Sequence, residues 1–257
     1  MILRLWQLQS KLKSCFRDMI TINADDFGRT QSINNAIIKS FNEGIINQTT
    51  IMVNMPYAES AILLSQDNNF FNNVGLHLNL DEGYPITNNI KKCKTFCKES
   101  GEFNGAFRKR RIKNLFLTKT ERMCCKEEIE AQMNKYISMG FTMKHLDSHH
   151  HIHVIPSILP IVVLSAKKKG FLSMRIRFNL QNTNVIKKIF TKCINLYISR
   201  FFRTTDYFCD SVYFTENKPI RESIEVMCHP DIYEGKLVDV IGKRESGQFG
   251  ELRKLKV

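Results

Sequence analysis

Short apolar runs alternate with helical patterns along most of this 257-residue chain, and this alternation limits the fold more than any other feature. The runs with strand character are residues 19–23, 49–53, 74–80, 172–176 and 223–227. The clearest helical patterns are residues 32–44, 57–65, 121–139 and 157–169. Strands that alternate with helices favour a parallel sheet, so we expect an α/β fold, either an open sheet or a (β/α) barrel. No fixed repeat and no linker divides the pattern, which predicts one domain.

Ionisable side chains stand at the carboxyl ends of four predicted strands. Asp25 and Asp26 follow the first strand, and His77 lies near the end of the third. Residues 145–153, HLDSHHHIH, hold five of the seven histidines and a carboxylate, and as a strand running into a loop they would place His145, Asp147 and His149 on one face. His229 follows the last strand. Because strand ends in a (β/α) barrel face one mouth, we expect these four groups to meet there.

An aspartate and two histidines are a typical ligand set for a divalent metal ion that takes part in hydrolysis. A second aspartate and a spare histidine would then provide a general base and a general acid. Each group alone has a simpler interpretation, since paired aspartates often form turns and a lone histidine is more often a hydrogen-bonded core residue. A histidine-rich loop can also take up metal adventitiously. Four such groups at four strand ends favour the metal site.

Positive charge is large and unevenly distributed. The formal net charge is +13, and residues 91–127 contain 12 Lys or Arg against 4 Asp or Glu. We interpret residues 88–120 as a basic insert near the barrel mouth. Such a segment can serve an anionic partner, although composition bias explains it as well. No signature of a nucleic-acid-binding module occurs, so no nucleic acid is expected as a partner.

The N-terminal region and the cysteines bear on location. Residues 1–18 are amphipathic, but their apolar run is too short and too interrupted for a transmembrane helix or a secretory signal. We expect them to be an extension outside the fold. The eight cysteines have no repeating spacing and no CxxC pair, which favours reduced thiols in a cytoplasmic protein. No membrane partner is expected, and a homodimer remains open.

Six stretches of the chain resemble the YdjC-like carbohydrate deacetylases, which include chitooligosaccharide deacetylases. They occur in the order and spacing of that family and read INADDFGRTQSINNAI, GIINQTTIMVN, VGLHLNLDEGYPI, HLDSHHHIHVIPSILPIV, MRI and EVMCHP. The resemblance implies a distorted (β/α) barrel of the polysaccharide-deacetylase type over residues 19–257. It also implies one bound Mg²⁺ or Zn²⁺ and a hydrolase that removes acetyl groups from N-acetylated sugars or oligosaccharides.

The matching motifs carry six residues with implied roles at the site. These roles are metal ligand for Asp26, His77 and His149, catalytic base for Asp25, catalytic acid for His229, and orientation of the base or binding of the substrate for Arg175.

The chain departs from the family after His229, where the family usually continues through a further strand and helix. Remnants of that part are expected at Lys243, Arg244, Glu245, Glu251 and Leu252, so the domain is expected to be short at its C-terminus. Two alternatives stay open. One is a metal-dependent phosphoesterase or amidohydrolase-like enzyme acting on an anionic substrate, which the basic segment favours. The other is an inactive sugar-binding relic, which the short C-terminus suggests.

Overall fold

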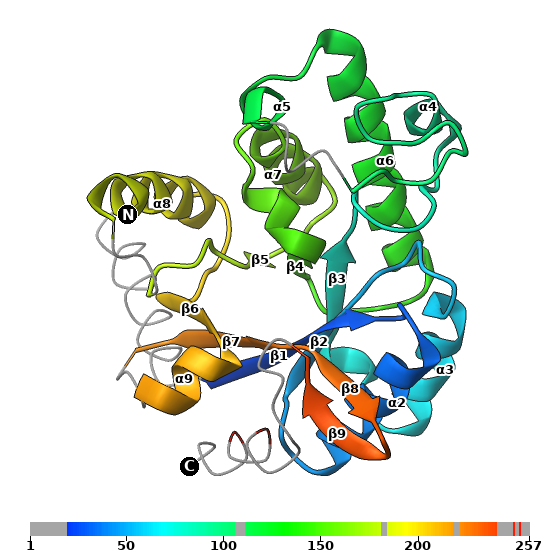
Figure 1. Cartoon of the computed structure of the whole chain (residues 1–257), viewed down its shortest axis with the longest axis vertical. Coiled ribbons are helices and arrows are strands. Elements are labelled where there is room, and N and C mark those ends of the chain that lie inside the picture. Colours follow the sequence, from blue (N-terminus) through cyan, green and yellow to red (C-terminus); the bar gives the residue numbers. More distant parts are fainter. Residues whose placement is uncertain are drawn as a thin grey trace, which may run out of the picture.

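A computed structural model describes residues 20–105, 111–180, 184–217 and 222–240, together with Phe249 and Leu252. Its described strands form a curled parallel sheet of seven strands in the order β5-β4-β3-β2-β1-β7-β6 (Figure 1). Strands β5 and β6 are the two edges, so the sheet is a half-barrel. The strands are β1 (Ile20–Phe27), β2 (Gln48–Ile51), β3 (Val74–Leu78), β4 (His145–Ser148), β5 (Ser173–Met174), β6 (Tyr207–Asp210) and β7 (Ile224–Cys228).

Helices connect these strands and lie outside the curl of the sheet (Figure 1). The longer ones are α2 (Gln31–Asn42), α3 (Ala58–Asp67), α6 (Lys119–Ser138), α7 (Leu159–Lys168) and α8 (Val185–Ser199). The shorter ones are η1 (Phe71–Asn73), α4 (Asn88–Lys91), α5 (Arg111–Leu115), η3 (His149–Val154) and α9 (Ser211–Asn217). An antiparallel hairpin of β8 (Pro230–Tyr233) and β9 (Lys236–Asp239) follows β7. The predicted alternation and the α/β class are therefore confirmed.

Local sequence determines where the longest helix begins and ends. The Thr118 side chain accepts a hydrogen bond from the backbone N–H of Glu121, and the Glu121 carboxylate accepts one from the backbone of Thr118. This reciprocal capping satisfies two amide groups that a helix start leaves free. Gly140 follows the helix with a φ of 85°, a conformation in which glycine ends helices at little cost.

The strand predictions are incomplete at β5, β6 and the β8–β9 hairpin. Only Ser173 and Met174 of the apolar run 172–176 form β5. Strand β6, of four residues, and the β8–β9 hairpin were not predicted. In contrast, β1 is longer than its apolar run and includes both aspartates. Segments of two to four residues show a period only weakly, so some of them become strands through pairing with neighbours that the sequence does not reveal.

The basic segment packs into the fold. Ile90, Phe96 and Phe103 are buried and belong to the same core as the strands. The backbone N–H of Phe103 also donates to the Gly83 carbonyl at 2.8 Å, which ties the segment to the loop after β3. The basic insert predicted near the barrel mouth is therefore not confirmed.

The described residues test only part of the predictions about cellular location and about the two chain termini. None of the helices in the described ranges is long and apolar enough to cross a bilayer. The cysteines that the structure describes are free thiols, as expected for reduced cysteines. The predictions for residues 1–18 and for Lys243, Arg244, Glu245 and Glu251 lie outside the described residues. Leu252 is described and fully buried.

Candidate active site

Both aspartates of β1 reach the site because the strand is irregular at its end. The pairing of β1 with β2 shifts register between Ala24 and Phe27, and Asp26 has a φ of 70°. Adjacent residues of a regular strand point to opposite faces, whereas this break in the strand allows Asp25 and Asp26 to serve one site. Aspartate tolerates the left-handed conformation better than most residues do. Both carboxylates are buried.

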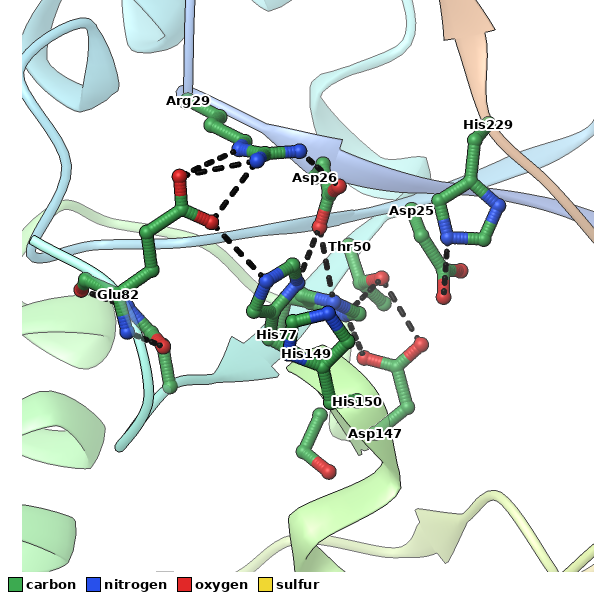
Figure 2. A network of polar contacts seen from close by, with 12 residues as sticks. Asp25, Asp26, Arg29, Thr50, His77, Glu82, Asp147, His149, His150 and His229 are labelled. Carbon is green, nitrogen blue, oxygen red and sulfur yellow. Dashed lines mark hydrogen bonds and ion pairs between the residues drawn. The ribbon is translucent and has the colours of Figure 1, made fainter. Parts of the chain in front are cut away.

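The three predicted metal ligands form a compact buried cluster (Figure 2). Asp26 Oδ1 lies 2.9 Å from His149 Nδ1 and 3.3 Å from His77 Nε2. One ligand atom from each of the three side chains lies within 4.8 Å of the others. A carboxylate and two imidazoles brought this close together fit a divalent cation. The structure therefore brings the predicted ligand set together.

Charge in the cluster shifts the pKa of each member. Burial opposes the shift, but hydrogen bonds from His149 and His77 hold the pKa of the Asp26 carboxyl well below its usual value. Burial likewise acts to lower the pKa of His77, yet the carboxylates of Asp147 and Asp25 outweigh it and raise that pKa to about 10. The cluster thus favours positive charge at its centre, which is the property a cation site requires.

Asp147 on β4 orients His77. Its Oδ1 lies 2.7 Å from His77 Nδ1, and its Oδ2 accepts a hydrogen bond from the Thr50 hydroxyl at 3.0 Å. A carboxylate behind a ligating histidine fixes the ring and directs its other nitrogen toward the cation, here Nε2 toward Asp26. The alternation of the histidine-rich strand placed Asp147 near a possible metal site, but the family motifs assigned it no role. The only sequence signal for it was its position in the histidine-rich strand.

Arg175 is fully buried and lies against three carboxylates. Its two terminal nitrogens donate to both oxygens of Asp25 at 2.7 Å each, and its Nε donates to Glu225 at 2.6 Å. It also lies 2.7 Å from Asp147. This paired geometry is the strong form of an Arg–carboxylate contact, and it fixes the orientation of Asp25.

His229 lies at the open side of the same network. Its side chain is 23% exposed, and its Nε2 is 3.8 Å from Asp25 Oδ2. The His229 backbone N–H donates to Asp239 Oδ1 of the β8–β9 hairpin at 3.1 Å, which holds the residue just past β7. The predicted base and acid are therefore neighbours, and the acid has access to solvent.

Glu82 and Arg29 complete the rim of the cluster and were missed by the sequence analysis. Glu82 Oε2 lies 3.1 Å from His149 Nε2, and the guanidinium of Arg29 bridges Glu82 at 2.9 Å and Asp26 at 3.1 Å. Each is partly exposed. Because the contacts join the loop after β1 to the loop after β3, no local pattern in the sequence could have indicated them.

A cavity of about 300 Å³ lies beside the cluster. His150 and His151 form part of its wall and have φ values of 51° and 55°, an unusual conformation for two consecutive histidines. The His151 ring packs edge-on against Phe178 and Phe208. The cavity is lined by Asn114, His150, His151, Val154, Ile155, Arg177 and Phe178.

A curled parallel sheet with a buried Asp–His cluster at its carboxyl end is the arrangement of a barrel-like α/β enzyme. The chain belongs to the family described as YdjC-like protein, which it matches over residues 19–251.

Curated relatives and a solved structure agree with that assignment. A carbohydrate deacetylase of Vibrio parahaemolyticus is 32% identical over 229 residues, covering 85% of this chain and 80% of that protein. A carbohydrate deacetylase of Clostridium beijerinckii is 30% identical over 236 residues, covering 85% of this chain and 84% of that protein. A crystal structure from Enterococcus faecalis, described as a candidate cellobiose-phosphate cleavage protein, has a TM-score of 0.67 at 22% identity and covers 93% of both chains. The last comparison shows the shared fold.

Proposed function

We propose that this protein is a metal-dependent hydrolase that removes acetyl groups from N-acetylated sugars or oligosaccharides. Membership of the YdjC-like family and relatives named carbohydrate deacetylases support this function. The observation that carries the proposal is the position of Asp25 and His229 next to the cluster of Asp26, His77 and His149. A cation site, a base and an acid are the components of metal-assisted amide hydrolysis.

Asp26, His77 and His149 would hold one divalent cation. Two imidazoles and one carboxylate favour Zn²⁺ over Mg²⁺, because magnesium prefers oxygen ligands. When bound, the cation supplies Lewis acidity that makes hydrolysis of an amide feasible near neutral pH. Asp147 would keep His77 in the ligating orientation through its 2.7 Å contact with Nδ1.

Asp25 and His229 would move the protons. Asp25 takes a proton from the attacking water as the water oxygen bonds to the acetamide carbonyl carbon. His229 then gives a proton to the amine nitrogen as the C–N bond breaks, which releases acetate and the free amino sugar. Arg175 has no exposed surface and holds both oxygens of Asp25, so we assign it to orientation of the base, the first of the two roles expected for it.

A second candidate is hydrolysis of an anionic substrate, and one observation favours it. Arg177 lines the cavity beside the cluster, and burial lowers the pKa of its guanidinium. No ion pair to Arg177 occurs among the described residues, where its cation lies 5.5 Å from the centre of the Phe190 ring. A phosphate or carboxylate group on the substrate could therefore pair with it.

The test is release of acetate from N,N′-diacetylchitobiose by protein loaded with Zn²⁺ or Mg²⁺, with a phosphodiester assayed in parallel. We expect acetate from the wild type and none from Asp25→Asn or His149→Ala. Bound metal should be lost only in His149→Ala, and His150→Ala, which changes the neighbouring histidine outside the cluster, should keep it. Phosphodiester hydrolysis without acetate would select the second candidate. Neither activity, with metal content unaffected by His149→Ala, would contradict both.

A further inference from the structure

Helix α8 carries apolar side chains on the face that points away from the protein. Only Thr191, Ile194 and Ile198 of this helix are buried. At 100° per residue, the exposed apolar residues span about 140° on roughly the opposite side. We call this set the α8 apolar face, and its members with their exposed fractions are Val185 67%, Ile186 77%, Ile189 60%, Phe190 41%, Leu196 60% and Tyr197 36%.

Positive charge flanks the α8 apolar face. The helix contains Lys187, Lys188 and Lys192 and no acidic residue. These lysines are exposed, and the positions of Lys188 and Lys192 on the helix adjoin one edge of the face. On α7, Lys167 lies 5.1 Å from the centre of the Phe201 ring, which brings a further cation to the C-terminal end of α8. An apolar stripe bordered by lysines is typical of a helix that lies in a membrane interface.

We propose that α8 binds the surface of an anionic lipid bilayer. The α8 apolar face would enter the boundary between headgroups and acyl chains, and the lysines would contact anionic headgroups. This inference does not depend on the proposed catalytic function. It also differs from the sequence-based expectation of no membrane partner.

Residues 1–18 or the α8 helix of a second copy could also cover the α8 apolar face, but charge favours an anionic bilayer over both. Residues 1–18 are amphipathic but basic, with Arg4, Lys11, Lys13 and Arg17 against the single acid Asp18. A second copy of α8 would likewise place lysines against lysines. The whole chain carries +13, so either arrangement adds like charge, whereas an anionic surface neutralises it.

The α8 apolar face begins next to the candidate active site. Phe190, in the N-terminal half of α8, lies under the guanidinium of Arg177, and Arg177 lines the cavity beside His150. Figure 1 shows α8 at the rim of the molecule, outside β5 and β6. A protein bound through α8 would therefore hold its substrate cavity close to the membrane surface.

The test is co-sedimentation of the full chain with vesicles, using phosphatidylglycerol mixed with phosphatidylcholine and phosphatidylcholine alone. We expect binding only to vesicles that contain phosphatidylglycerol, and weaker binding as salt rises. The double variants Ile186→Ser with Ile189→Ser and Lys188→Glu with Lys192→Glu should each lose roughly tenfold or more in affinity. Leu63→Ser is the matched control, because Leu63 on α3 is 63% exposed and lies on a different helix.

Three results would overturn the proposal. The first is no binding to phosphatidylglycerol vesicles, and the second is binding that the isoleucine variant keeps. The third is binding that appears only after residues 2–18 are deleted, which would make that segment the natural cover of the face. If no vesicle binding occurs and light scattering shows a dimer that the isoleucine variant converts to a monomer, a second copy is the occupant. Circular dichroism of each variant checks that the fold is retained.

Discussion

Two regions of this molecule reverse the usual placement of side chains. At the strand ends, charged groups that normally stay in water are buried, and on α8, apolar groups that normally pack inside are exposed. The buried charges have partners within the chain, as Arg175 does in Asp25 and Glu225. The α8 apolar face remains exposed in the described structure. The buried charges at the strand ends are therefore paired with one another, whereas the described residues cover little of the α8 apolar face.

The largest expected effect on stability comes from removing the arginine that pairs with the buried carboxylates at the strand ends. Arg175→Met leaves the carboxylates of Asp25, Asp147 and Glu225 buried without their shared cation, so the free energy of unfolding should fall by about 3–5 kcal/mol. Arg177→Met is the matched control, because Arg177 is partly exposed and has no ion pair among the described residues. Urea denaturation measures both. Equal losses in the two variants would show that the buried network does not depend on its arginine.

A smaller effect tests the cation site. Asp147→Asn removes the carboxylate that orients His77, and metal affinity should fall about 10–100-fold. Asp67→Asn makes the same chemical change on the exposed end of α3 and should leave affinity unchanged. Competition with a chromogenic chelator measures the affinity. If Asp147→Asn bound metal with wild-type affinity, the Asp147 carboxylate would not be needed to orient the His77 ring.

Mild acid should weaken the buried site without affecting α8. His153 is buried as a neutral group between Ser148 and the Arg175 carbonyl, and burial lowers its pKa to about 4. The unfolded chain takes up this proton near pH 6.5 and the folded chain does not, so stability is lost as pH falls from about 6.5 to 4. Thermal unfolding at a series of pH values measures the loss. His153→Gln should flatten the curve in this window, and an unchanged curve would exclude His153 as the cause.

The smallest expected effect concerns α8 itself. Ile189→Ala, on the α8 apolar face, should change the free energy of unfolding by less than about 0.5 kcal/mol. Ile198→Ala, on the buried side of the same helix, should cost about 2–4 kcal/mol. The pair is measured by urea denaturation of the full chain without vesicles. A loss in Ile189→Ala as large as that in Ile198→Ala would mean that the face is already covered in solution.

The sequence predicted the strand-end groups because a single rule applies to them. Asp25, Asp26, His77 and His229 each lie in the last residues of a strand or just past it, and parallel strands bring such ends together. Contacts between distant segments were less predictable, as shown by Arg175 and Glu225, which are 50 residues apart and whose pairing was not predicted. A single sequence contains no signal for which partner a buried charge selects.

Helix α8 was difficult to predict for a different physical reason. The sequence of residues 179–202 shows a mixed, mostly helical pattern, in which apolar side chains occur on the buried and on the exposed side of α8. The sequence alone therefore did not show which side of this helix packs against the sheet.

Asp26 couples folding to chemistry in a way that has an evolutionary consequence. Its left-handed backbone suits glycine better than aspartate, but Asp26→Gly would delete the candidate ligand and also leave His77, His149 and Arg29 without their shared carboxylate. Stability and chemistry therefore constrain this position together. In a lineage that no longer uses the site, position 26 should drift only together with the cationic residues around it.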